Sequence, residues 1–167
     1  RWTGKENATI VYDSTTDEFT AHGLFRAIRD RPNIAIVGVT TDGDVFGGFY
    51  SVAVDRQVKA FYDRNIFIFS FQSHGRCVTP KGFVVKEDMR GRVHVRFMKN
   101  DTNGFVEFSV DGVYGFCLGN EKSKSSCFDL SRGFEGIVDA TLSGQNNTKC
   151  RIPPYHHCTR LIAIQLS

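Results

Sequence analysis

The chain has 167 residues, of which 41% are hydrophobic and 13% aromatic, and its net charge is +3 at pH 7. This composition excludes disorder of the whole chain, and the length favours one domain over residues 1–167 rather than two. No apolar run approaches the roughly 18 residues of a membrane-spanning helix, so no membrane span is expected.

The N-terminal part is predicted to contain a strand and a helix. Residues 9–13 form a short apolar run typical of a strand, and a polar loop follows. Thr20 is a suitable helix N-cap, and the apolar residues after it recur at the spacing of one helix face. The apolar face consists of Ala21, Leu24, Phe25 and Ile28. Pro32 is expected to end the helix because proline restricts the residue before it.

Residues 33–52 are predicted to form a β-hairpin at the centre of the fold. Two runs rich in β-forming residues, 34–39 and 45–52, flank Asp42-Gly43, and Asp-Gly between such runs is a strong hairpin signal. Within the second run, Gly47-Gly48 leaves bare backbone. The glycine pair indicates a bulge or close packing against another part of the protein, or else the approach of a ligand.

The remaining apolar runs predict antiparallel strands. Residues 66–71 are apolar on both faces, as expected of a central strand that is covered on both sides. Residues 93–98 and 105–110 alternate in polarity, which predicts a second hairpin. Shorter strands are expected at 83–86, 113–118 and 161–166. With about nine strands, one clear helix and no βαβ alternation, the fold class is α+β or a sandwich decorated by a helix.

The cysteines indicate the compartment. The five residues Cys77, Cys117, Cys127, Cys150 and Cys158 are an odd set without the spacing of a disulfide scaffold. A chain of this length has a core that holds it without disulfides, so reduced thiols and a cytoplasmic location are expected. The first residue is Arg1 rather than Met and no leader precedes it, so the chain is expected to be either a processed product or a domain cut from a longer chain.

Four short stretches carry a resemblance to a known family. They are Val45-Phe46-Gly47-Gly48-Phe49, Phe67-Ile68-Phe69-Ser70, Gly115-Phe116-Cys117-Leu118 and Ser125-Ser126-Cys127-Phe128. Together with Asp42 and Gly43 in the preceding turn and the order strand, helix, hairpin, they make residues 10–166 resemble a TLDc domain. This module occurs in oxidation-resistance proteins and in some proteins that carry a Rab-GTPase-activating domain.

The resemblance implies a fold and a role. It implies a two-sheet antiparallel β-sandwich with flanking helices, and a part in protection from oxidative stress. Members of the family are associated with binding to the vacuolar proton-pumping ATPase. The family has no settled catalytic mechanism, so no catalytic residue is inferred and no cofactor is expected.

Two sets of residues are candidates for chemistry. Cys150, His156, His157 and Cys158 have the side chains that zinc prefers, but they lack a Cys-x-x-Cys pair, and adjacent histidines on a strand point to opposite faces. Surface histidines beside a structural cysteine are the alternative.

Cys127 is a candidate redox-sensitive thiol. Lys122 and Lys124 lie near it in sequence, and adjacent cations stabilise a thiolate. Burial of Cys127 in the core is the alternative, since free cysteines are among the most buried residues.

Three functional hypotheses follow from these observations. The first is a non-enzymatic TLDc-like domain that binds a protein partner, with proton-pump subunits implied by the resemblance. The second is a redox-active or peroxide-sensing domain that uses Cys127 or another thiol. The third is a nucleic-acid-binding stress regulator. It would use a dispersed basic set with the aromatics Phe25 and Phe61 beside it: Arg26, Arg29, Arg31, Arg56 and Lys59. The sequence leaves the oligomeric state open.

Overall fold

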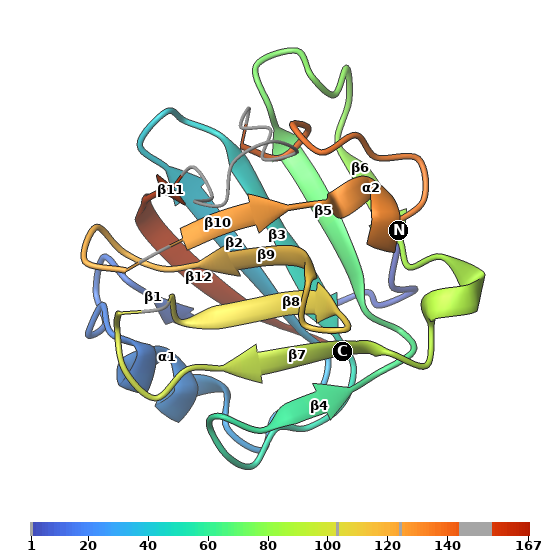
Figure 1. Cartoon of the computed structure of the whole chain (residues 1–167). Helices are drawn as coiled ribbons and strands as arrows, with labels where there is room; N and C mark the ends of the chain where they lie inside the picture. The colour runs from blue at the N-terminus through green and yellow to red at the C-terminus, as the bar shows by residue number, and fades with distance from the viewer. Residues whose placement is uncertain (1, 103, 124, 144–154) are drawn as a thin grey trace.

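The computed structural model describes residues 2–102, 104–123, 125–143 and 155–167. The strands form two antiparallel sheets of six strands each. Figure 1 shows that the two sheets pack face to face. Sheet A contains, in spatial order, β1 (Ala8–Asp13), β12 (Cys158–Leu166), β2 (Ile34–Thr40), β3 (Val45–Tyr50), β5 (Phe67–Gln72) and β6 (Lys81–Val84). Sheet B contains β11 (Tyr155–His156), β10 (Ser125–Phe128), β9 (Tyr114–Leu118), β8 (Val106–Val110), β7 (Val93–Phe97) and β4 (Ala60–Tyr62).

The α+β sandwich is confirmed, but the estimate of about nine strands was too low. Three of the twelve strands in the described parts of the chain were not predicted from the sequence: β4, which pairs with β7, and β10 and β11, which pair with each other. All three additional strands have four residues or fewer, too few to show a clear period of two. Only pairing with a neighbouring strand makes them part of a sheet.

The first hairpin has the predicted form. Strands β2 and β3 pair in register from Ile34 opposite Tyr50 to Val39 opposite Val45. The loop closes with a bond from the Thr40 N–H to the Asp44 carbonyl oxygen at 2.9 Å. Gly43 has a φ of +83°, a conformation that favours glycine, which explains its place in the turn.

The main core lies between the sheets and is built on phenylalanine. In the second hairpin, β7 pairs with β8 as predicted, and Val93, Val95 and Phe97 point into the core. Phe116 stacks on Phe108 and meets Phe46 edge-on, each at a centroid distance of 5.4 Å. Aromatic contacts of this kind hold the two sheets together.

Helix α1 (Ala21–Ile28) packs its apolar face onto this core. The Thr20 hydroxyl oxygen accepts a bond from the Gly23 N–H at 3.0 Å, so the predicted N-cap is confirmed. The helix ends at Ile28 rather than next to Pro32. Asp30 has a left-handed φ of 60°, and its N–H donates to the Val54 carbonyl oxygen at 2.8 Å. This contact draws the backbone out of the helix before the proline is reached.

Arg76 joins three loops at one end of sheet A. Its Nη2 donates to the buried Asp44 carboxylate at 2.5 Å, and its guanidinium also donates to the carbonyl oxygens of Thr141 and Leu142 at 3.2 Å. His74 Nδ1 lies 2.8 Å from the same Asp44 oxygen. The β2–β3 turn, the β5–β6 loop and the segment before residue 144 are therefore fixed to one another.

The helices are short. Besides α1 they are α2 (Leu130–Gly133) and the 3₁₀ turn η1 (Glu87–Met89). In the part of the chain that the structure describes, no helix has the length and apolar character needed to pass through a membrane.

Candidate functional site

The outer face of sheet A, turned away from sheet B, is apolar. Val37, Phe49, Phe67 and Phe69 form a second buried cluster apart from the main core. Ala35, Val45, Ile162, Ile164 and Leu166 pack around it. The sequence predicts that the strand at 66–71 is covered on both faces, and this is confirmed for Phe67 to Phe69. Phe67 and Phe69 lie in the outer cluster, and Ile68 lies in the main core. Phe71 remains 45% exposed.

The strand register explains why these side chains meet. Alternate residues of a strand point to the same face, so Phe67, Phe69 and Phe71 line one side of β5. Phe49 on β3 lies opposite Phe67, and the two rings stack at a centroid distance of 5.2 Å. Each central strand of sheet A thus adds apolar side chains to both of its faces.

Trp2 covers part of this outer face. Its indole ring lies 6.1 Å from the Phe67 ring, 6.0 Å from Phe69 and 5.9 Å from Phe71, between centroids. It is the only tryptophan of the chain and remains 44% exposed. Trp2 is therefore an aromatic side chain that a partner could contact directly.

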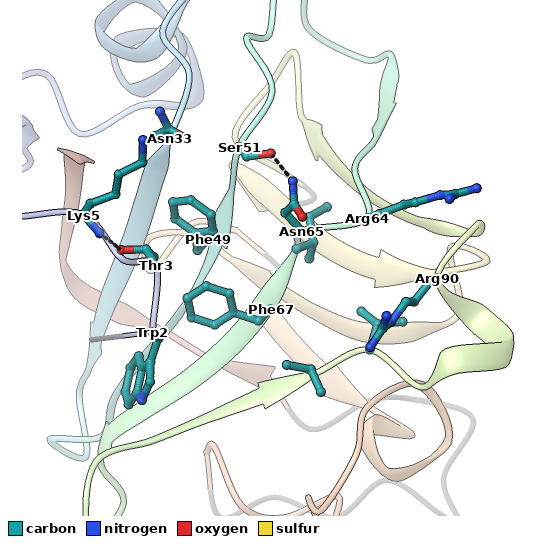
Figure 2. A pocket seen from close by; sticks show the side chains of 13 residues that line it. Trp2, Thr3, Lys5, Asn33, Phe49, Ser51, Arg64, Asn65, Phe67 and Arg90 are labelled. Carbon is teal, nitrogen blue, oxygen red and sulfur yellow. Dashed lines mark hydrogen bonds between the residues drawn. The ribbon is translucent and has the colours of Figure 1, made fainter. Parts of the chain in front are cut away.

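Two adjoining cavities open beside Trp2, and both are lined by Trp2, Thr3, Lys5, Phe49 and Phe67. The apolar cavity, of about 390 Å³, continues over Val37, Phe69, Ile164 and Leu166. The basic cavity, of about 500 Å³, continues to Asn65, Arg64 and Arg90. We call the two cavities together the aromatic groove. Figure 2 shows the rings of Phe49 and Phe67 between Trp2 on one side and the two arginines on the other.

A buried carboxylate organises the basic end of the aromatic groove. Asp63 accepts hydrogen bonds from the Ser51 N–H at 2.5 Å, the Ser51 hydroxyl at 3.0 Å and the Asn65 N–H at 2.9 Å. Asn65 Nδ2 donates to the Ser51 hydroxyl oxygen at 3.0 Å, as Figure 2 shows. Arg64 lies between Asp63 and Asn65 in sequence, so its backbone is fixed while its side chain is exposed.

The charge of the aromatic groove is positive. Lys5, Arg64 and Arg90 line it, and none of the described residues that line either cavity is acidic. Arg90, directly after η1, pairs with the exposed Glu87 at 2.8 Å. The surface combines aromatic rings with cations, which suits binding.

The predicted motif at Asp42 to Phe49 has both structural and surface parts. Phe49 lines the aromatic groove, whereas Phe46 lies in the main core. A Cβ on Gly47 would meet the Ile36 carbonyl oxygen at 1.8 Å, and one on Gly48 would meet the Phe108 ring at 2.6 Å. Protein atoms fill the space that a ligand would need, so the glycines serve close packing.

The structure contradicts the physical basis of the redox prediction for Cys127. The side chain is buried in the main core, and burial raises the pKa of its thiol to about 12. A reactive thiolate needs the opposite shift and an exposed position. Lys122 is exposed and Lys124 lies outside the described residues, so sequence proximity was a poor guide to the environment of the thiol.

The zinc candidates are not brought together among the described residues. Cys150 lies outside them, and so does the side chain of His156 on β11. Cys158 is buried, and burial raises the pKa of its thiol to about 12. Within the described parts of the chain, no three histidine, cysteine or acidic side chains cluster as a metal site would require.

The basic set proposed for nucleic acid is dispersed. Arg29 pairs with Asp30 at 3.4 Å, and Arg31 donates to Gln165 at 3.0 Å. Arg56 pairs with Asp55 at 2.9 Å, and Lys59 lies over the Phe61 ring, so four of the five basic residues are engaged with neighbouring side chains.

A buried polar cluster on sheet B was not predicted from the sequence. The Ser109 hydroxyl donates to Glu107 Oε1 at 2.6 Å and lies 3.2 Å from His94 Nε2, and Arg96 pairs with Glu107. Burial lowers the pKa of His94. Glu107 binds the serine instead of orienting the histidine, and all three side chains are buried from substrate, so the cluster is structural.

The sequence analysis also missed Trp2, Arg64 and Arg90. Only Trp2 had a signal, and it was indirect: the outward apolar residues of 66–71 require a cover, and an aromatic side chain can supply it.

Comparison with known proteins identifies one family. The sequence pattern of the TLDc domain matches residues 2–134. The matched range extends from Trp2 to the residue after α2 and contains the stretch Val45-Phe46-Gly47-Gly48-Phe49. No curated protein matches the chain.

Proposed function

Because the chain belongs to the TLDc domain family, we propose that it is a non-enzymatic protein-interaction domain that acts in the oxidative-stress response by binding the vacuolar proton-pumping ATPase. The observation that supports this proposal is the aromatic groove. It exposes Trp2 and Phe71 above a recessed apolar face, and large exposed aromatic patches are typical of protein-binding surfaces. Cys77, Cys117, Cys127 and Cys158 are free thiols, which supports a cytoplasmic setting for the interaction.

Capture of the pump tests the proposal. The tagged chain is incubated with solubilised vacuolar ATPase, and the retained pump subunits are quantified by immunoblotting. We expect retention by the wild-type chain and a clear loss with Trp2→Ala combined with Phe71→Ala. The matched control is Tyr62→Ala, which removes an exposed aromatic side chain from β4 of the other sheet. If the wild-type chain retains no pump subunits above background, the proposed partner is wrong.

The stress role has its own readout. Cells that express the wild-type chain should survive peroxide better than cells that express the double variant at the same level. Equal survival with and without the chain would contradict the stress role even if the pump is bound.

A further inference from the structure

The aromatic groove joins an apolar cavity to a basic one, and we infer that it binds an extended peptide segment of the partner that carries a bulky apolar side chain beside carboxylates. The inference rests on the proposed function and adds the chemistry of the segment that is recognised. The two cavities meet at Phe49, Phe67 and Trp2, so one short segment can enter both.

The apolar cavity is suited to a single inserted side chain. Its floor is recessed: Phe49 is 5% exposed and Phe67 9% exposed, whereas Trp2 beside them is 44% exposed. A side chain that enters next to Trp2 would bury its own apolar surface together with that of the indole. Pockets that desolvate one large side chain in this way supply most of the affinity of many interfaces.

The basic cavity selects the charge of the peptide residues that lie next to the inserted apolar side chain. Among the described residues neither Lys5 nor Arg64 has an ion-pair partner, and Arg90 has only the exposed Glu87. Arginine binds carboxylates through two parallel hydrogen bonds. Glu87 lines a further cavity with Arg64 and Arg90, so an incoming carboxylate competes with it at Arg90 but meets at Arg64 a guanidinium that no described side chain pairs with. Glutamate or aspartate next to the apolar anchor would therefore be favoured over lysine.

The same geometry disfavours two other classes of partner. A bilayer surface cannot reach the recessed Phe49 and Phe67, whereas a single side chain can. A nucleic-acid backbone needs a denser row of cations than Lys5, Arg64 and Arg90 provide, and much of the aromatic groove is aliphatic.

Selection from a random peptide library tests the inference without assuming a sequence. The whole 167-residue chain is the bait. We expect the enriched peptides to carry a large apolar residue next to acidic residues. Enrichment of basic peptides, or of none, would overturn the inference.

Binding of an enriched peptide without tryptophan can then be followed through the fluorescence of Trp2, the only tryptophan of the chain. Arg64→Gln combined with Arg90→Gln should weaken binding about tenfold, the combined effect of losing two exposed ion pairs. Lys99→Gln combined with Lys122→Gln removes the same charge from loops beside sheet B and should leave the affinity unchanged. Equal weakening by both pairs would mean that net charge, and not the aromatic groove, attracts the peptide.

Binding of the chain to phosphatidylserine vesicles and, separately, to a single-stranded oligonucleotide is measured for comparison. Stronger binding of either than of the acidic peptides would assign the surface to that class of partner instead. The two proposals fail separately. Loss of peptide binding with retained pump capture would overturn the peptide inference alone, and peptide binding without pump capture would overturn only the identity of the partner.

Discussion

At the scale of single residues, Gly48 sets how closely the two sheets approach each other. Its missing side chain leaves room for the ring of Phe108, which lies in the centre of the main core. Gly47 has the same role within sheet A, against the backbone of Ile36. The family motif at these positions therefore describes packing, while Phe49, one residue further on, belongs to the aromatic groove.

Gly48→Ala should destabilise the fold by about 1–3 kcal/mol because the new methyl group must displace the Phe108 ring. Chemical denaturation with the linear extrapolation method measures the change. Gly91→Ala is the matched control, since a Cβ there has no atom within 4 Å, and it should change stability by less than about 0.5 kcal/mol. Equal unfolding midpoints for the two variants would contradict the packing role.

The candidate site could be predicted from the sequence only in part. The two-sided apolar pattern of 66–71 indicated that something covers the outer face of sheet A. It could not identify Trp2 as the cover, because that contact joins residues far apart in the chain. Arg64 and Arg90 looked like ordinary surface charges, and only the fold places them beside Phe67. For Cys127, neighbours in sequence indicated a reactive thiol, whereas neighbours in space bury it.

At the scale of elements, Arg76 couples the β2–β3 turn to the β5–β6 loop. Its partner Asp44 has only 3% of its side chain exposed, so the carboxylate depends on the guanidinium and on His74 for compensation. Leaving a buried charge without its partner is more costly than losing a pair on the surface.

Arg76→Gln should therefore lower the free energy of unfolding by about 2 kcal/mol, a value reduced for the partial exposure of Arg76. Arg92→Gln is the control, because Arg92 pairs with Asp111 at 2.7 Å on the surface, and its loss should cost less than about 1 kcal/mol. Urea denaturation of both variants measures the two changes in the free energy of unfolding. A larger effect of Arg92→Gln would show that the coupling of the loops adds no stability.

Most elements follow from local sequence signals. Both hairpins and the start of α1 are where the apolar periods and the N-cap predict them. The end of α1 differs from the prediction. A long-range hydrogen bond from the Asp30 N–H to the Val54 carbonyl oxygen ends the helix before Pro32 is reached. The fold class could be inferred from many short strands without βαβ alternation, but the strand order within each sheet could not, since it depends on pairing between distant segments.

At the scale of the whole molecule, three thiols tie stability to pH. Burial raises the pKa of Cys117, Cys127 and Cys158 above that of a free thiol. Below the unfolded pKa of about 8.5 the thiols are protonated in both states, and their burial costs no ionisation energy. Above that pH the unfolded state releases protons that the folded state retains, so stability decreases as pH rises toward the folded pKa values.

We expect the free energy of unfolding to decrease above pH 9, with each buried thiol contributing up to about 1.4 kcal/mol per pH unit. Denaturation between pH 7 and 10.5 measures the slope. Cys127→Ala should make the decrease shallower, whatever its effect at neutral pH. A wild-type slope of zero over this range would contradict the burial of the thiols.

The place of β12 in sheet A has a consequence for how the protein is made. Strands β1 and β2 leave the ribosome early, yet β12 lies between them, and it pairs Leu166 with Ala8 at the other end of the sequence. Contacts so distant in sequence form slowly and only after the last strand is available. The nascent chain therefore carries two open strand edges until β12 emerges from the ribosome, and unpaired edges of this kind favour aggregation during that period.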